Sequence, residues 1–258
     1  LPDAQLFSTV ISAFGKAGRA AEADQLFVQL EEFAQKPGIV NPDQLRPDAV
    51  LYSDLIWAYA KVGDTQRAEQ VLQRMIQSME DQAMVNISPP EGATGLHNTS
   101  EMTTTNDWLS GWNGVLVSWT ESRHPNAPKY IRRVLDRMEK LTQANPQLPQ
   151  LTAYHYNILL SCYSRQCTIE AAKDVNNLVD WMWQQVQNGN SQLAPDRDTY
   201  LNVLTAWCNI GQTQRANDYL FYYCRQIDSG DMEKDLLDQQ HFAIVMEGWV
   251  KQEHPKAI

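Results

Sequence analysis

Residues 47–75 read PDAVLYSDLIWAYAKVGDTQRAEQVLQRM, and this stretch decides the fold. Its first half places Tyr52, Leu55, Ile56 and Tyr59 at offsets of 3, 4 and 7 residues. These offsets bring the four side chains onto one face of an α-helix. A small residue directly before the second aromatic would let a neighbouring helix approach closely. We call this predicted element helix A.

The second half of the stretch predicts another helix. Gly63 follows helix A, at the point where the left-handed backbone of a helix C-terminus favours glycine. Ala68, Val71, Leu72 and Met75 then resume the helical spacing. The stretch therefore predicts two antiparallel helices, A and B, joined by a short turn.

The helix A pattern recurs six times along the chain, with its two aromatic columns filled in every copy. These columns use half of the 8 Trp, 10 Tyr and 6 Phe side chains, so chance is a poor explanation. The intervals between successive first aromatics are 45, 60, 44, 44 and 42 residues. The first aromatics are Phe7, Tyr52, Trp112, Tyr156, Tyr200 and Phe242.

This repetition predicts an all-α fold, an α-solenoid of antiparallel helix pairs with about six repeats, the last incomplete. Repeats one and two are expected in residues 1–80 and repeats three to six in residues 106–258. The long interval between repeats two and three holds residues 81–105, which contain no Lys or Arg and no apolar periodicity. We interpret residues 81–105 as a flexible polar insertion.

Composition narrows the classes of function. The formal net charge of −10 argues against a general duplex-DNA binder. No apolar run approaches the ~18–20 residues that cross a bilayer, so no membrane span is expected. The 4 cysteines form no CxxC pair, which disfavours a zinc site or a disulfide scaffold. We find no nucleotide-binding or catalytic motif, and therefore expect no enzyme activity, cofactor, metal or small-molecule substrate.

Pro-Asp stands before several copies of helix A, as in Pro47-Asp48 and Pro195-Asp196, and helix A itself can open with Tyr156-Asn157. With these features the sequence resembles the pentatricopeptide repeat family. Tetratricopeptide repeats are the alternative, but their ~34-residue repeat follows a different signature. The resemblance implies single-stranded RNA recognition, at about one base per repeat. It also implies a role in RNA processing, stability or translation in a mitochondrion or chloroplast.

In the family, the residue after the first aromatic and the last residue before the following repeat read each base. The resemblance therefore assigns base reading to Ser8, Asp48, Ser53, Asn113, Thr152, Asn157 and Asp196. It implies guanine for Ser8 with Asp48, uracil for Asn157 with Asp196, and a pyrimidine for Asn113 with Thr152. Repeat two is left unread, because Ser53 would pair with Trp108, and Leu201 of repeat five departs from the code. The alternative for these Ser, Asn and Asp residues is ordinary helix capping.

Basic residues recur at the ends of the predicted A helices, and the resemblance implies that they contact phosphate. They are Lys16, Lys61, Arg165 and Lys251. The alternative is that they complement the helix dipole, which is favourable without any ligand. A second hypothesis for the whole chain is a protein–protein interaction scaffold, a TPR-like solenoid without RNA reading. The acidic charge and Leu201 favour that scaffold.

Overall fold

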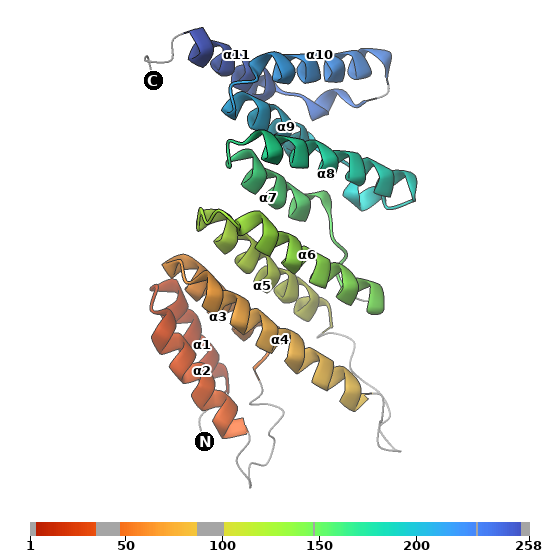
Figure 1. Cartoon of the computed structure of the whole chain (residues 1–258). Coiled ribbons are helices and arrows are strands. Elements are labelled where there is room, and N and C mark those ends of the chain that lie inside the picture. The colour runs from red at the N-terminus through yellow and green to blue at the C-terminus, as the bar shows by residue number, and fades with distance from the viewer. Residues whose placement is uncertain (1–3, 35–46, 87–100, 147, 231, 254–258) are drawn as a thin grey trace. The chain divides into compact units, whose positions relative to one another are not determined.

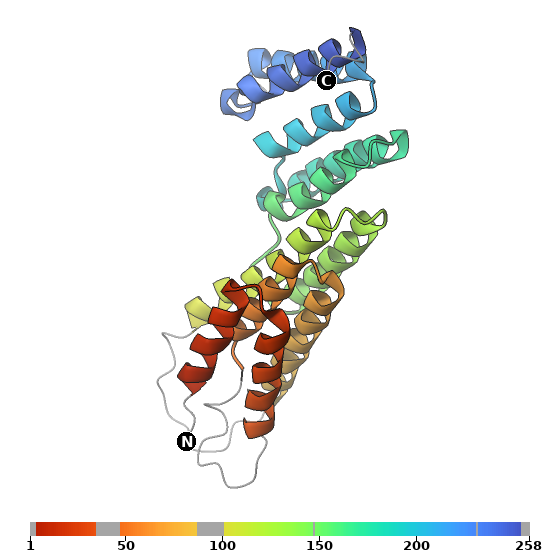
Figure 2. The ribbon, with the colours of Figure 1, turned by 90° about the vertical axis from the view of Figure 1, so that its left-hand side faces the viewer.

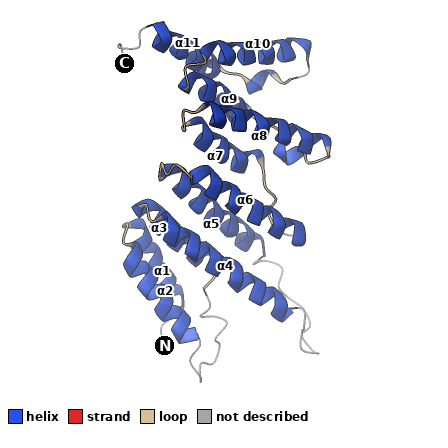
Figure 3. Cartoon of the chain, viewed as in Figure 1, coloured by secondary structure: helices blue, strands red, loops and turns tan. Residues whose placement is uncertain are grey.

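A computed structural model of the chain describes residues 4–34, 47–86, 101–146, 148–230 and 232–253 (Figure 1). Within these residues the chain forms eleven α-helices, two short 3-10 helices and no strand (Figure 3). The prediction of an all-α fold is confirmed. The chain divides into two compact units, an N-terminal unit of Leu1–Arg123 with Asn145–Pro149, and a C-terminal unit of His124–Ala144 with Gln150–Ile258. None of the described helices is long and apolar enough to cross a membrane.

The N-terminal unit contains two helix pairs and one further helix A. Its helices are α1 (Ala4–Lys16), α2 (Ala20–Ala34), α3 (Ala49–Val62), α4 (Thr65–Asn86) and α5 (Glu101–Glu121). Helix α1 packs on α2 and α3 packs on α4, as the predicted A–B pairs. The A helices α1, α3 and α5 also pack on one another in that order (Figure 2).

The C-terminal unit repeats this arrangement. Its helices are α6 (Ala127–Ala144), α7 (Ala153–Ser164), α8 (Ile169–Gln187), α9 (Arg197–Asn209), α10 (Thr213–Ser229) and α11 (Gln239–Glu253), with the short η2 (Ser191–Leu193) and η3 (Lys234–Leu236). Helices α7 and α8, and α9 and α10, form A–B pairs, and α7, α9 and α11 pack side by side. Within the described residues no helix B follows α11, whose first aromatic, Phe242, is 45% exposed.

The small-residue column lets successive A helices approach closely. Ala58, Ser118, Cys162 and Ala206 are all buried. In α11 the column holds Gly248, where an added Cβ would lie only 2.9 Å from the Thr213 side chain of α10. A larger residue in this column would therefore push the next repeat away.

The turns between the helices of a pair follow the prediction. The backbone φ angle of Gly63 is +78°, and its N–H donates to the Ala60 carbonyl, which closes α3. Cys167 takes the place of this glycine in repeat four, and it also adopts a positive φ, of +52°. The left-handed turn is thus kept where the sequence no longer has the glycine.

Two tryptophans of the second aromatic column donate hydrogen bonds from their indole N–H groups to the preceding helix B. In repeat three, Trp119 Nε1 donates to Glu69 Oε2 of α4 at 3.3 Å. In repeat five, Trp207 Nε1 donates to Asn176 Oδ1 of α8 at 3.4 Å. Each aromatic therefore buries its ring in the core while its N–H ties one helix pair to the next.

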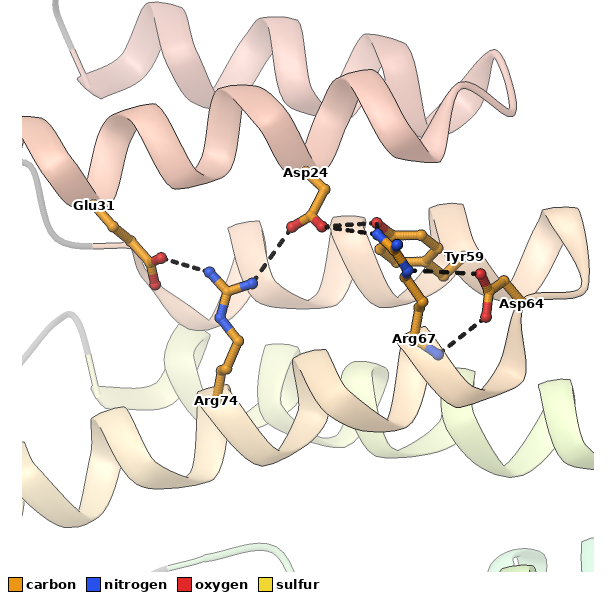
Figure 4. Close-up of polar contacts among 6 residues, drawn as sticks. All are labelled: Asp24, Glu31, Tyr59, Asp64, Arg67 and Arg74. Atoms are coloured by element: carbon orange, nitrogen blue, oxygen red, sulfur yellow. Dashed lines mark hydrogen bonds and ion pairs between the residues drawn. The ribbon is translucent and has the colours of Figure 1, made fainter.

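A polar network joins the first two helix pairs (Figure 4). Arg74 of α4 lies 2.5 Å from Glu31 and 3.4 Å from Asp24, both on α2. Tyr59 of α3 donates its hydroxyl to Asp24 at 2.8 Å and accepts a hydrogen bond from Arg67 at 3.3 Å. Asp24 and Glu31 are thus paired with Arg74 in contacts between repeats. Part of the negative charge of the chain is therefore used within the fold.

The helices extend further than the predicted boundaries. Helix α4 continues to Asn86 and α5 begins at Glu101, so both ends of the proposed 81–105 insertion are helical. The stretches 81–86 and 101–106 contain no Gly or Pro that would stop a helix. The centre of the insertion, residues 87–100, lies outside the described residues.

Candidate nucleic-acid interface

Most of the predicted base-reading residues lie near the starts of the A helices, whereas Asn113 lies in the second half of α5. One predicted pair is joined directly. Asn157 of α7 donates its amide Nδ2 to Asp196 Oδ1 at 2.8 Å. The Thr199 hydroxyl of α9 donates to Asn157 Oδ1 at 2.7 Å. The three side chains form a cluster between two neighbouring A helices. Asn157 is 8% exposed and Thr199 is fully buried, which makes the cluster rigid.

Asp196 also caps α9, as the capping alternative expects. Its Oδ1 accepts the Thr199 backbone N–H at 2.9 Å, and its own N–H donates to the Thr199 hydroxyl at 3.1 Å. This is a reciprocal capping box. Oδ2 of Asp196 takes part in none of these bonds. Capping fixes the carboxylate and leaves one oxygen for a further donor.

The other pairs are arranged differently. Asp48 is exposed and caps α3 by accepting the Leu51 N–H at 2.9 Å, while Ser8 is half-buried on α1. Thr152 caps α7, where its N–H donates to Nδ1 of His155 at 3.1 Å. Burial lowers the pKa of His155, which favours the neutral ring that accepts this bond.

Two predicted readers in the N-terminal unit lie against or within the packed helices. Ser53 is 5% exposed, and a Cβ added at Gly111 of α5 would lie 3.2 Å from its hydroxyl oxygen. Asn113 is half-buried, and its Oδ1 is buried without a hydrogen bond from the described residues. The close approach of α5 removes Ser53 from the surface that a base could reach.

Repeat five departs from the code at Leu201, and the residue that would pair with Leu201 is Asp238. Beside the apolar Leu201, the carboxylate of Asp238 is already engaged at its two oxygens. Oδ2 lies 2.8 Å from Arg197 Nη1, and Oδ1 lies 2.8 Å from Nδ1 of His241. The hydrogen bond to His241 lowers the pKa of Asp238. This carboxylate serves the contact between α9 and α11.

The four predicted phosphate contacts are all exposed at the ends of A helices. Lys61 Nζ donates to the Lys16 carbonyl at the end of α1, at 2.6 Å. Arg165 folds back on its own helix and donates to the carbonyl and hydroxyl oxygens of Ser161, at 3.1 and 3.0 Å. Lys251 lies in the last turn of α11. Lys61 and Arg165 thus satisfy helix-terminal carbonyls, as the dipole alternative requires.

Asn209 shows that an uncharged side chain at the position of the predicted phosphate contacts can also join neighbouring repeats. Asn209 replaces the basic residue in repeat five, and its Nδ2 donates to the Ser164 carbonyl at the end of α7, at 3.0 Å. The bond is the counterpart of the one from Lys61 to α1. Bridging the ends of neighbouring A helices is therefore a structural role of the column.

Two family models match the chain. The pentatricopeptide repeat domain matches residues 39–79, and the PPR repeat matches residues 6–33. These two stretches of the chain therefore match pentatricopeptide repeats, in line with the resemblance found in the sequence. No curated protein matches this sequence.

Among solved structures, this chain is similar to the crystal structure of the pentatricopeptide repeat protein PPR10 in complex with an 18-nt psaJ RNA element. The two sequences are 13% identical, and the match covers 96% of this chain and 48% of the other. The chain thus spans about half the length of the structure it matches. The TM-score between the two structures is 0.23.

Sequence reasoning missed two features of the structure. One is Thr199, which completes the cluster of Asn157 and Asp196, although its position three residues after a capping Asp was a visible signal. The other is a pocket of about 310 Å³ among α1, α3 and α5. Trp57 lines this pocket. The sequence could have indicated it, because the helical spacing places Trp57 outside the core face that carries Tyr52 and Tyr59.

Within the described residues, no three His, Cys, Asp or Glu side chains are gathered as a metal site.

Proposed function

We propose that the chain is a non-catalytic, sequence-specific single-stranded RNA-binding protein. The two matches to pentatricopeptide repeats support this proposal, because repeats of this kind read about one base each with two or three side chains. By the same family-level inference, we propose a role in RNA processing, stability or translation in a mitochondrion or chloroplast. The proposed readers are Ser8 with Asp48, Asn113 with Thr152, and Asn157 with Asp196. The proposed phosphate contacts are Lys16 and Lys251.

The observation that carries the proposal is the cluster of Asn157, Asp196 and Thr199. Asn157 Nδ2 has two hydrogens, and the bond to Asp196 uses one of them. The second N–H and the Asp196 Oδ2 atom offer one donor and one acceptor side by side. Uracil presents the complement, a carbonyl oxygen beside the N3–H group. Because Asn157 is nearly buried, the base would approach over the half-buried Asp196.

A protein-binding scaffold is the second candidate. The burial of Ser53 and the engagement of Lys61 and Arg165 with backbone carbonyls favour it, because each removes a group that RNA would use. The two candidates differ in one respect that can be measured. Only RNA reading predicts a base preference that depends on Asn157.

The deciding experiment is selection from a random single-stranded RNA pool at low salt, followed by sequencing. We expect enrichment of G-N-Y-U across repeats one to four. Asn157→Ala should lose the preference for U and keep the G. The matched control is Asn217→Ala, which removes a half-buried asparagine from the helix B α10. Absence of RNA binding by a protein that circular dichroism shows to be folded would favour the scaffold.

A further inference from the structure

The pocket among α1, α3 and α5 is lined by Trp57, which lies one helical turn beyond the predicted reader Ser53 on α3. None of the predicted readers lines the pocket itself. The volume of about 310 Å³ is at the lower end of the ~300–1,000 Å³ range of small-ligand sites. The pocket therefore suits a single flat ring better than a large ligand.

Trp57 is held in place and still presents its ring. Its Nε1 donates to Ser110 Oγ of α5 at 3.1 Å. A Cβ added at Gly114 would lie 3.3 and 3.4 Å from two indole carbons, so the ring packs on the backbone of α5. The side chain nevertheless remains 40% exposed. An aromatic ring that is already ordered loses little entropy when a ligand stacks on it.

The charges around the pocket balance. Lys16 and Lys61 lie at one end of their helices, and Asp54 and Glu121 complete the charged lining. Two positive and two negative groups leave no net charge that would attract a cationic side chain, and the two lysines would repel it. A neutral ring suits this balanced lining. The carboxylates could accept hydrogen bonds from ring N–H groups.

We propose that Trp57 is a stacking platform for one nucleobase of a bound RNA strand, in a site additional to the base-reading pairs. The proposal rests on the proposed function of RNA binding. It gives repeat two a contact with RNA although its reader, Ser53, is buried. Stacking on an aromatic face tolerates any base, so the site adds affinity and little sequence preference.

The test uses the RNA sequence enriched by selection, with a single abasic nucleotide moved through every position. Wild-type protein should lose affinity at one position outside the reading pairs, on the order of 5- to 150-fold, as expected for one stacked base. Trp57→Ala should bind the intact RNA more weakly by the same factor and be insensitive to the abasic nucleotide there. Trp57→Phe should keep most of the affinity. The matched control is Trp183→Ala, since Trp183 on α8 has nearly the same exposure, 38%.

A second measurement does not depend on the folding of any variant. A photoreactive base placed at the sensitive position should crosslink to a wild-type peptide that contains Trp57. Crosslinking elsewhere, or Trp57→Ala with unchanged affinity, would overturn the stacking site and leave the RNA-binding function standing. An arginine-rich peptide that binds wild type but not Trp57→Ala, without any effect of abasic nucleotides, would assign the pocket to a protein partner. If wild-type protein binds no RNA, the proposed function fails, and the stacking site fails with it.

Discussion

Two glycines of α5 face the same residue of α3 and should respond differently to alanine. A Cβ at Gly114 would lie 2.9 Å from Ile56 Cγ2, which is closer than carbon atoms pack. A Cβ at Gly111 would lie 3.1 Å from Ile56 Cδ1 and 3.2 Å from Met75 Cε. The first neighbour is a methyl on a β-branched carbon, and the other two are the far ends of flexible side chains.

The magnitudes follow from these contacts. Replacing Gly by Ala inside a helix stabilises it by about 1 kcal/mol. Overpacking a filled core costs about 1–3 kcal/mol. Ile56 is fully buried and restricted at χ1, so Gly114→Ala should lower the free energy of unfolding by about 1 kcal/mol net. A Cβ at Gly111 would also lie 3.2 Å from the Ser53 hydroxyl oxygen, but none of its contacts is as close as the one at Gly114. For Gly111→Ala we therefore expect a net change between zero and about 0.5 kcal/mol of stabilisation.

Urea unfolding of the full chain, followed by far-UV circular dichroism at 25 °C, compares the two variants directly. The midpoint for Gly114→Ala should fall below that of wild type, and the midpoint for Gly111→Ala should not. If wild type and both variants have equal m-values, the differences in urea midpoint are differences in the free energy of unfolding. If the Gly114→Ala variant is at least as stable as the Gly111→Ala variant, the contact with Ile56 Cγ2 does not limit how closely α5 approaches α3, and the argument is refuted.

Three further predictions concern pH, charge and a buried hydrogen bond. Burial lowers the pKa of His155 in the folded chain. As the pH falls through about 6.5, the unfolded chain therefore binds more protons than the folded chain. The free energy of unfolding should be highest above that pH and decrease below it. His155→Gln should flatten the decline in urea midpoint between pH 7.5 and 5.5, and parallel profiles would contradict this. Arg74→Met should cost about 1–2 kcal/mol of unfolding free energy because Glu31 and Asp24 both lose their ion pair with Arg74, and the loss should shrink in 1 M NaCl. Ser118 Oγ donates to Thr65 Oγ1 at 3.0 Å in the core, so Ser118→Ala and Thr65→Val should each cost about 1 kcal/mol, and the double variant clearly less than their sum. Additive losses would mean that the bond contributes nothing to stability.

Much of the fold could be predicted because the repeats impose it locally. Spacing of aromatic and aliphatic residues identifies each helix A, and a small residue marks where the next helix A approaches. The turn after α7 shows the limit of a residue-type rule, since Cys167 adopts the left-handed conformation that Gly63 adopts in repeat two. The helical spacing on either side, and not glycine alone, determines the turn.

The candidate site was less predictable because its properties depend on neighbouring repeats. The pattern placed Ser53 in the reading column, but its burial follows from Gly111, which belongs to the next repeat and lets α5 approach. Likewise, the engagement of Lys61 with a carbonyl of α1 depends on the packing between helices. Reading each repeat by itself gives the residue type at a position and not its accessibility.

The cluster of Asn157, Asp196 and Thr199 has a consequence for exchanging repeats between proteins. Its members belong to two consecutive A helices, so a cut placed in the loop between repeats would separate residues that hydrogen-bond to one another. The smallest segment that keeps this cluster whole therefore begins before Asn157 in α7 and ends after Thr199 in α9. Chimeras with both junctions outside residues 157–199 should keep the cluster, whereas chimeras joined at the Pro195 loop should inherit mismatched halves of it.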